Sequence, residues 1–161
     1  MRSANTAHLH HKLEASDPRT SARRLLHKAR ELRRLDRLEE AAALYAQSVQ
    51  LWEEYQEGPP GPGEANARFE QALLLVALKH HELAASAWRA FLFRFGDSDA
   101  PNIMRQGALA RFNEGVAFHD TGRWAEAVTA YDEVEYLYGD HDNVGFAELA
   151  AKALLNKGLL L

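Results

Sequence analysis

Small and apolar residues recur at steps of three and four positions along most of the chain. One such stripe runs from Leu109 to Phe118, and a second runs from Trp124 to Tyr138. This spacing is the period of an α-helix with one buried face, and the two-residue alternation of a strand is nowhere sustained. Because Thr121-Gly122 interrupts the pattern between the two stripes, the sequence predicts a hairpin of two helices joined by a short turn.

The same pattern returns at a shift of 43 residues, without gaps. The matching columns are Ala29, Ala72, Gly115 and Gly158; Ala41, Ala84 and Ala127; Leu32, Leu75, Phe118 and Leu161; and Trp52, Phe95 and Tyr138. A fixed period of this length is typical of stacked helical units that bury their faces against one another. The predicted fold is therefore all-α, a stack of antiparallel hairpins with about seven helices. The hairpins are expected at residues 22–56, 64–96 and 99–139, followed by a lone helix at 144–161.

Turn-forming residues predict the boundaries of these elements. Asp36 followed by Glu39 has the spacing of a capping box, which indicates a helix start, and Gly139 is expected to end a helix in a left-handed conformation. Residues 58–63 contain three prolines and are expected to form a non-helical linker. Residues 1–17 show no periodicity and are expected to be a flexible tail, which leaves 18–161 as a single domain.

The hairpins resemble the tetratricopeptide repeat, most clearly the third. Gly115, Phe118, Gly122, Trp124, Ala127 and Tyr131 match the small, aromatic, turn, aromatic, small and aromatic positions of that family. The resemblance covers residues 22–161 and implies a right-handed superhelix whose first helices line a concave, peptide-binding surface. The repeat of this chain is longer than the family's roughly 34 residues, and the additional residues fall between one hairpin and the next.

The resemblance also implies which residues would contact a peptide. Carried over by position, they are Arg23, His27, Arg30, Asn66, Phe69, Leu73, Leu109, Phe112, Asn113, Val116, Lys152 and Asn156. Asn113 and Asn156 occupy a position where the family often hydrogen-bonds a ligand backbone, since an amide both donates and accepts; the alternative is that both asparagines are merely tolerated on an exposed helix. The family's positions for clamping a carboxylate hold Leu26, Glu70 and Phe112, so a mixed apolar and polar peptide is expected.

The last helix of the sequence starts a fourth hairpin whose second helix is missing. Its end, Leu159-Leu160-Leu161, is apolar, whereas a terminal cap should have a polar outer face. Two explanations stay open at this stage. The helix associates with another copy, which makes the chain a homo-oligomeric structural module, or the chain is a fragment of a longer repeat protein.

Charge is distributed unevenly along the chain, whose formal net charge is -4. Residues 19–37 hold eight basic side chains against two acidic ones, and residues 97–142 hold ten acidic against three basic ones. The basic segment Arg19–Arg37 is interpreted first as a solvated helix face. The alternatives are a surface for an acidic partner segment, including the acidic end of another copy, and a nucleic-acid site, for which few aromatic residues are interleaved.

The candidates for catalysis and metal binding are few. The chain has no cysteine, and its clustered histidines, His8, His10, His11 and the pair His80-His81, lack the spacing of a metal site. Neither a nucleophile elbow nor a phosphate-binding loop is present. We therefore expect no enzyme, no cofactor and no metal. Without an apolar segment of signal or membrane-spanning length, a cytoplasmic protein is expected.

Overall fold

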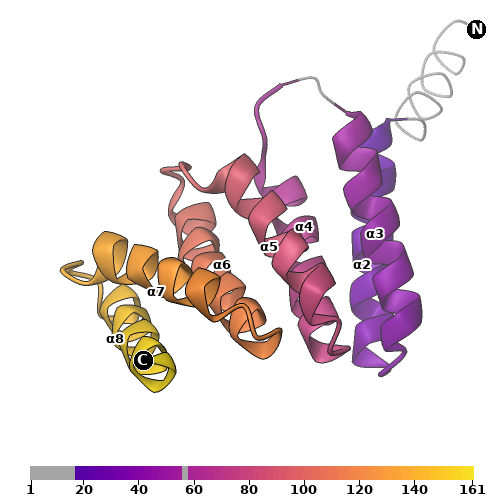
Figure 1. Ribbon diagram of the computed structural model, residues 1–161. Helices are drawn as coiled ribbons and strands as arrows, with labels where there is room; N and C mark the ends of the chain where they lie inside the picture. The colour runs from indigo at the N-terminus through magenta and orange to yellow at the C-terminus, as the bar shows by residue number, and fades with distance from the viewer. Residues whose placement is uncertain (1–16, 56–57) are drawn as a thin grey trace, which may run out of the picture. The chain divides into compact units, whose positions relative to one another are not determined.

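The computed structural model describes residues 17–55 and 58–161, and every regular element within these ranges is an α-helix (Figure 1). Helices that follow one another pack together in order within each part of the chain, which confirms the predicted all-α stack of hairpins. The seven helices of the described ranges are α2 (Pro18–Arg34), α3 (Leu38–Glu54), α4 (Pro62–Ala77), α5 (His81–Phe95), α6 (Pro101–Asp120), α7 (Trp124–Tyr138) and α8 (Val144–Leu160).

The chain divides into two compact units. The first ends at Ala67 and contains the α2–α3 hairpin with the first residues of α4, and the second runs from Arg68 to Leu161. The predicted single domain over residues 18–161 stays a prediction. In the part of the chain that the structure describes, no helix combines the length and the apolar character needed to cross a membrane.

The turns inside the three hairpins share one backbone conformation, at intervals of 43 residues. Asp36, Lys79 and Gly122 have positive φ angles of 58°, 60° and 73°. The next residue in each turn donates its N–H to a carbonyl five positions back: Arg37 to Leu32 at 3.0 Å, His80 to Leu75 at 2.9 Å and Arg123 to Phe118 at 2.8 Å. This is the hydrogen bond of a Schellman motif, which ends the first helix of each hairpin. The repeat of the sequence is therefore also a repeat of backbone geometry.

Three local predictions about boundaries are wrong. Asp36 takes the positive-φ position, so the residue before α3 is Arg37, whose guanidinium pairs with Glu40, and no capping box forms. Gly139 remains right-handed, with φ −59° and ψ −42°, because its N–H continues the helical pattern to the carbonyl of Glu135. Helix α4 begins inside the expected linker, at Pro62, because the fixed φ of proline suits the first turn of a helix.

The Lys79→Gly variant is expected to raise the free energy of unfolding by about 0.5–1 kcal/mol, because glycine relieves the strain of a positive φ at some cost in unfolded-state entropy. The reverse change at the equivalent turn, Gly122→Ala, should lower it by a similar amount. A Cβ atom on Gly122 would meet nothing within 4 Å, so the effect is conformational and not steric. Urea denaturation of both variants measures the two differences, and a loss of stability in Lys79→Gly would contradict the argument.

The hairpins are held together by aromatic rings packed on small residues. Tyr45, Trp88 and Tyr131, one per hairpin and 43 residues apart, are fully buried. In the third hairpin the two helices approach closely, because a Cβ atom added to Gly115 would lie 2.7 Å from Cε1 of Tyr131. A small residue at this position thus lets the ring of the second helix reach the backbone of the first.

Candidate functional site

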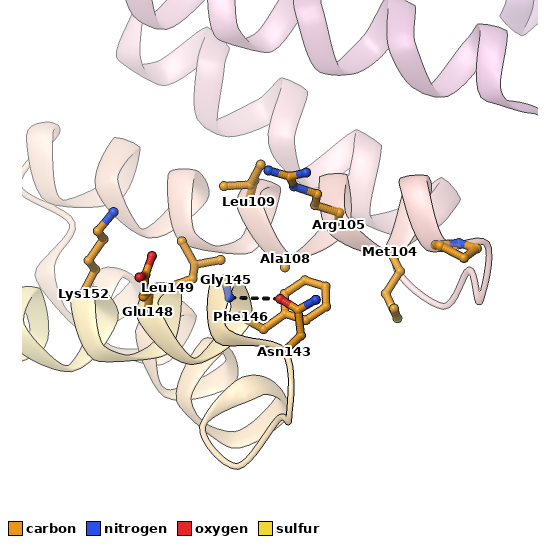
Figure 2. Close-up of a pocket in the computed structure, with 11 residues that line it drawn as sticks. Met104, Arg105, Ala108, Leu109, Asn143, Gly145, Phe146, Glu148, Leu149 and Lys152 are labelled. Carbon is orange, nitrogen blue, oxygen red and sulfur yellow. Dashed lines mark hydrogen bonds between the residues drawn. The ribbon is translucent and has the colours of Figure 1, made fainter.

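A groove of about 490 Å³ runs between α6 and α8 in the second unit (Figure 2). Ala108 of α6 with Phe146 and Leu149 of α8 gives it an apolar lining, and all three are buried. Its charged lining residues are Arg105 from α6 and Glu148 and Lys152 from α8. The groove therefore offers apolar contact together with ionic groups of both signs.

The start of α8 is fixed by contacts that also place Phe146 in the groove. Asn143 caps the helix, its side-chain oxygen accepting the N–H of Gly145 at 2.9 Å, as Figure 2 shows. The ring of Phe146 stacks on Tyr138 at 5.1 Å between centroids and meets His141 edge-on at 4.6 Å. Aromatic neighbours and a cap therefore hold the turn that forms this end of the groove.

Further along α6, a row of predicted site residues lies half-buried beside the core. Leu109, which lines the groove, and Phe112 and Val116 all pack against the core cluster of the second unit, and the Phe112 ring is 5.9 Å from that of Tyr131. Asn113 is also half-buried, and its amide has no hydrogen-bond partner among the residues that the structure describes. Of this row, Asn113 is the residue with unused hydrogen-bonding capacity.

Asn156, the second candidate asparagine, is already engaged. Its amide nitrogen donates to the hydroxyl of Tyr131 at 3.4 Å. Burial raises the pKa of Tyr131, so this hydroxyl remains protonated across the physiological range. The next residue, Lys157, bonds Asp132 at 2.7 Å and Glu135 at 2.8 Å. These contacts join α8 to α7. They indicate that Asn156 holds α8 in place, and its amide nitrogen is already bonded within the protein.

The buried carboxylate of Glu114 lies outside the groove. Its Oε1 is 3.3 Å from Nε of Arg89, and burial raises the pKa of Glu114 even though Arg89 opposes that shift. A perturbed acid is a common sign of a catalytic site. Here it belongs to an ion pair between α5 and α6, and it is not among the residues that line the groove. The ion pair with Arg89 gives the buried Glu114 carboxylate a structural role.

The other predicted site residues lie elsewhere. Arg23, His27, Arg30 and Asn66 belong to the first unit, and Phe69 and Leu73 lie on the part of α4 in the second unit. Phe69 is buried, with its ring 5.2 Å from Trp88, so it presents no surface to a ligand, whereas Leu73 is exposed. The structure thus brings Leu109 and Lys152 together in one groove of the second unit.

The basic segment Arg19–Arg37 makes several contacts within the first unit. The guanidinium of Arg19 lies 4.5 Å from the ring centroid of Tyr55, and that of Arg23 lies 5.8 Å from Trp52. His27 is 3.5 Å from Glu31, and Arg34 is 3.7 Å from the same carboxylate. A phosphate or an acidic segment that binds here would compete with these contacts.

Metal binding finds no cluster of ligands in the described ranges. There, no group of three or more His, Cys, Asp or Glu side chains could hold an ion. His81 lies 3.3 Å from Asp120, across the α5–α6 contact. His8, His10 and His11 lie outside the described residues, so the sequence interpretation of these three stays a prediction.

Sequence reasoning missed Arg105, Phe146, Glu148 and Leu149, which line the groove. The 43-residue repeat could have identified two of them. Arg105 and Glu148 are equivalent positions in the repeat, and each lies one helical turn before a predicted site residue, Leu109 or Lys152. The lining residues include no serine, cysteine or histidine, so the groove is suited to non-covalent recognition.

No protein-family model and no curated protein matches this chain.

Proposed function

We propose that this chain is a scaffold that binds a peptide or a segment of another protein along the groove between α6 and α8. The observation that supports the proposal is the combination of the apolar surfaces of Phe146 and Leu149 with the charges of Arg105 and Lys152 in one concavity. Binding sites are typically apolar concavities in which a few polar groups orient the ligand. The resemblance to tetratricopeptide repeats favours the same face, with a cytoplasmic setting and no catalysis.

The charges of the groove indicate the kind of ligand. Arg105 and Lys152 contribute two positive charges against one negative charge from Glu148. A peptide with an apolar anchor and a neighbouring acidic residue complements this arrangement, because the anchor fills the groove and the acid pairs with a cation at its edge. The free amide of Asn113, further along α6, is suited to a hydrogen bond with the backbone of an extended segment.

Selection of peptides from a random displayed library on the purified protein tests the proposal. The double variant Arg105→Glu, Lys152→Glu should weaken selected peptides by about tenfold or more, since each reversal replaces attraction with repulsion. Asn113→Ala should weaken them less, by the loss of one hydrogen bond. The matched control is Arg24→Glu, a charge reversal at an exposed residue of α2 outside the groove.

Fluorescence anisotropy with labelled peptides gives the dissociation constants, and thermal melting shows whether each variant is folded. Groove variants are preferable to Phe112→Ala, because Phe112 packs on the core and its loss would confuse binding with stability. Peptides that bind the folded double variant as tightly as the unaltered protein would remove the groove from the proposal. A library that yields no specific peptide would remove peptide binding itself.

A further inference from the structure

One largely exposed flank of α8 carries small and large residues that alternate from Ala151 onward. The α8 seam consists of Ala147, Ala151, Leu154, Gly158 and Leu161, at steps of four and three. Leu154 is 50% exposed and Leu161 89% exposed, and Ala151 and Gly158 are exposed as well. Steps of four and three are the spacing by which one helix packs along another. No helix of the described chain covers this flank.

The equivalent flank of the preceding first helix is covered. On α6 the positions 43 residues before Ala151, Gly158 and Leu161 are Ala108, Gly115 and Phe118, and all three are buried. Half-buried Met104 and Arg111 stand in the places of Ala147 and Leu154. Helix α7, which packs against α6 in the antiparallel direction, covers the middle of this flank, with the ring of Tyr131 against Gly115. The α8 seam therefore has the residue pattern of a surface that receives an antiparallel helix.

The order of residues along the seam identifies a helix that fits. From Ala151 to Leu161 the order is small, large, small, large. Reversing the direction exchanges the small and large positions, so the seam is complementary to an antiparallel copy of itself. Leu154 would then pack on the partner's Gly158, as Tyr131 packs on Gly115, and Leu161 would pack on the partner's Ala151.

We infer that the α8 seam joins two copies of this chain through an antiparallel α8–α8 pair about a twofold axis. Such an interface is self-complementary, as a twofold dimer requires. A groove of about 650 Å³ adjoins the seam, lined by Ala147, Ala151 and Leu154 together with Glu135 and Tyr136 of α7. It leaves room beside Ala151 for the partner's Leu161.

A second copy is a better occupant than the other helices of this chain. Helices α3 and α7 each cover the first helix of their own hairpin, so neither is available without unfolding it. The seam is also separate from the peptide groove, because Arg105, Glu148 and Lys152 are not part of it. The inference therefore does not depend on the proposed function, and the Arg105→Glu, Lys152→Glu variant should dimerise normally.

The dimer is expected to be reversible and weak. A single helix pair buries less than the roughly 1,000 Å² that a stable interface usually needs. Sedimentation equilibrium of the full chain over a range of concentrations, at low and at high salt, should show monomer and dimer in exchange. Because every side chain of the seam is uncharged, the dissociation constant should change little with salt.

The Gly158→Leu variant tests the fit of the seam. A Cβ atom at Gly158 meets nothing within 4 Å, so the monomer should fold. In the dimer, leucine would collide with the partner's Leu154, and the dissociation constant should rise by about tenfold or more, since overpacking disrupts a close contact. If the two surfaces associated only through unspecific apolar contact, the dissociation constant should fall instead, because the variant adds apolar area.

The control is Leu159→Gln, an exposed leucine next to Gly158 that lies off the seam. It should leave the dimer unchanged, and circular dichroism should show both variants to be equally helical. Three results would overturn the inference: a monomer at all concentrations, a Gly158→Leu dimer as tight as the unaltered one, or a dimer that high salt dissociates. The last of these would instead support docking between basic and acidic segments.

Discussion

The Gly115→Leu variant is expected to lose about 3 kcal/mol of its free energy of unfolding, because the new side chain must enter space that the Tyr131 ring occupies. Even a single added carbon would lie 2.7 Å from Cε1 of that ring. Tyr131 is fully buried, so it cannot swing into solvent to make room. Relief requires α6 and α7 to separate, which exposes the core on both sides of the hairpin.

The repeat provides the control for this variant at its own equivalent position. Gly158→Leu makes the same change 43 residues later, on a helix face that nothing covers. There the monomer should be as stable as before or gain up to about 0.8 kcal/mol, the difference in helix propensity between leucine and glycine. Urea denaturation at low protein concentration measures both variants. Equal losses at the two positions would show that helix propensity or local strain, and not the aromatic contact, governs the result.

Removal of the ring is expected to be as damaging as its displacement. Tyr131→Ala should cost about 3–5 kcal/mol, the usual range for deleting a large buried aromatic side chain. The ring lies against Gly115 and near Phe112, and its hydroxyl accepts the amide of Asn156. Its loss therefore loosens the packing of α7 on α6 and the contact of α7 with α8 together.

Hydrogen exchange measured by mass spectrometry is the appropriate readout, because it follows the two units of the chain separately. In Tyr131→Ala, exchange should accelerate in α6, α7 and α8, while α2 and α3 in the first unit keep their protection. Tyr131→Phe retains the ring and removes only the hydroxyl, so it should cost about 1 kcal/mol or less. If both variants lost a similar free energy of unfolding, the hydrogen bond of the hydroxyl, and not the packing of the ring, would be the main source of stability.

The periodicity of small and aromatic residues predicted the fold well, because packing inside a hairpin depends on size at fixed positions. Ala41, Ala84 and Ala127 are all fully buried, as a repeated contact requires. Local rules were less successful at the turns. Asp36 has the sequence spacing of a capping residue, yet it lies one residue before the N-cap Arg37, in the left-handed conformation of the turn that ends α2. Most side chains avoid this conformation.

The groove was predicted only in part, since its shape depends on how two helices far apart in sequence are spaced. Leu109 and Lys152 could be chosen by position, but Phe146 belongs to it because the turn before α8 stacks its ring on Tyr138. Trp124 shows an error in the other direction. The apolar stripe of α7 predicts that this residue is buried, but its side chain is exposed. At the ends of helices, the side-chain period alone does not decide which residues are covered.

The common geometry of the hairpin turns makes this chain modular in length. Arg37, His80 and Arg123 begin their helices with closely similar dihedral angles, φ −89° and ψ 67°, φ −84° and ψ 63°, and φ −85° and ψ 61°. Cutting at one of these residues and rejoining at another would leave the backbone of the junction unchanged. Duplication or loss of DNA encoding a 43-residue segment could therefore lengthen or shorten the protein without disturbing a turn.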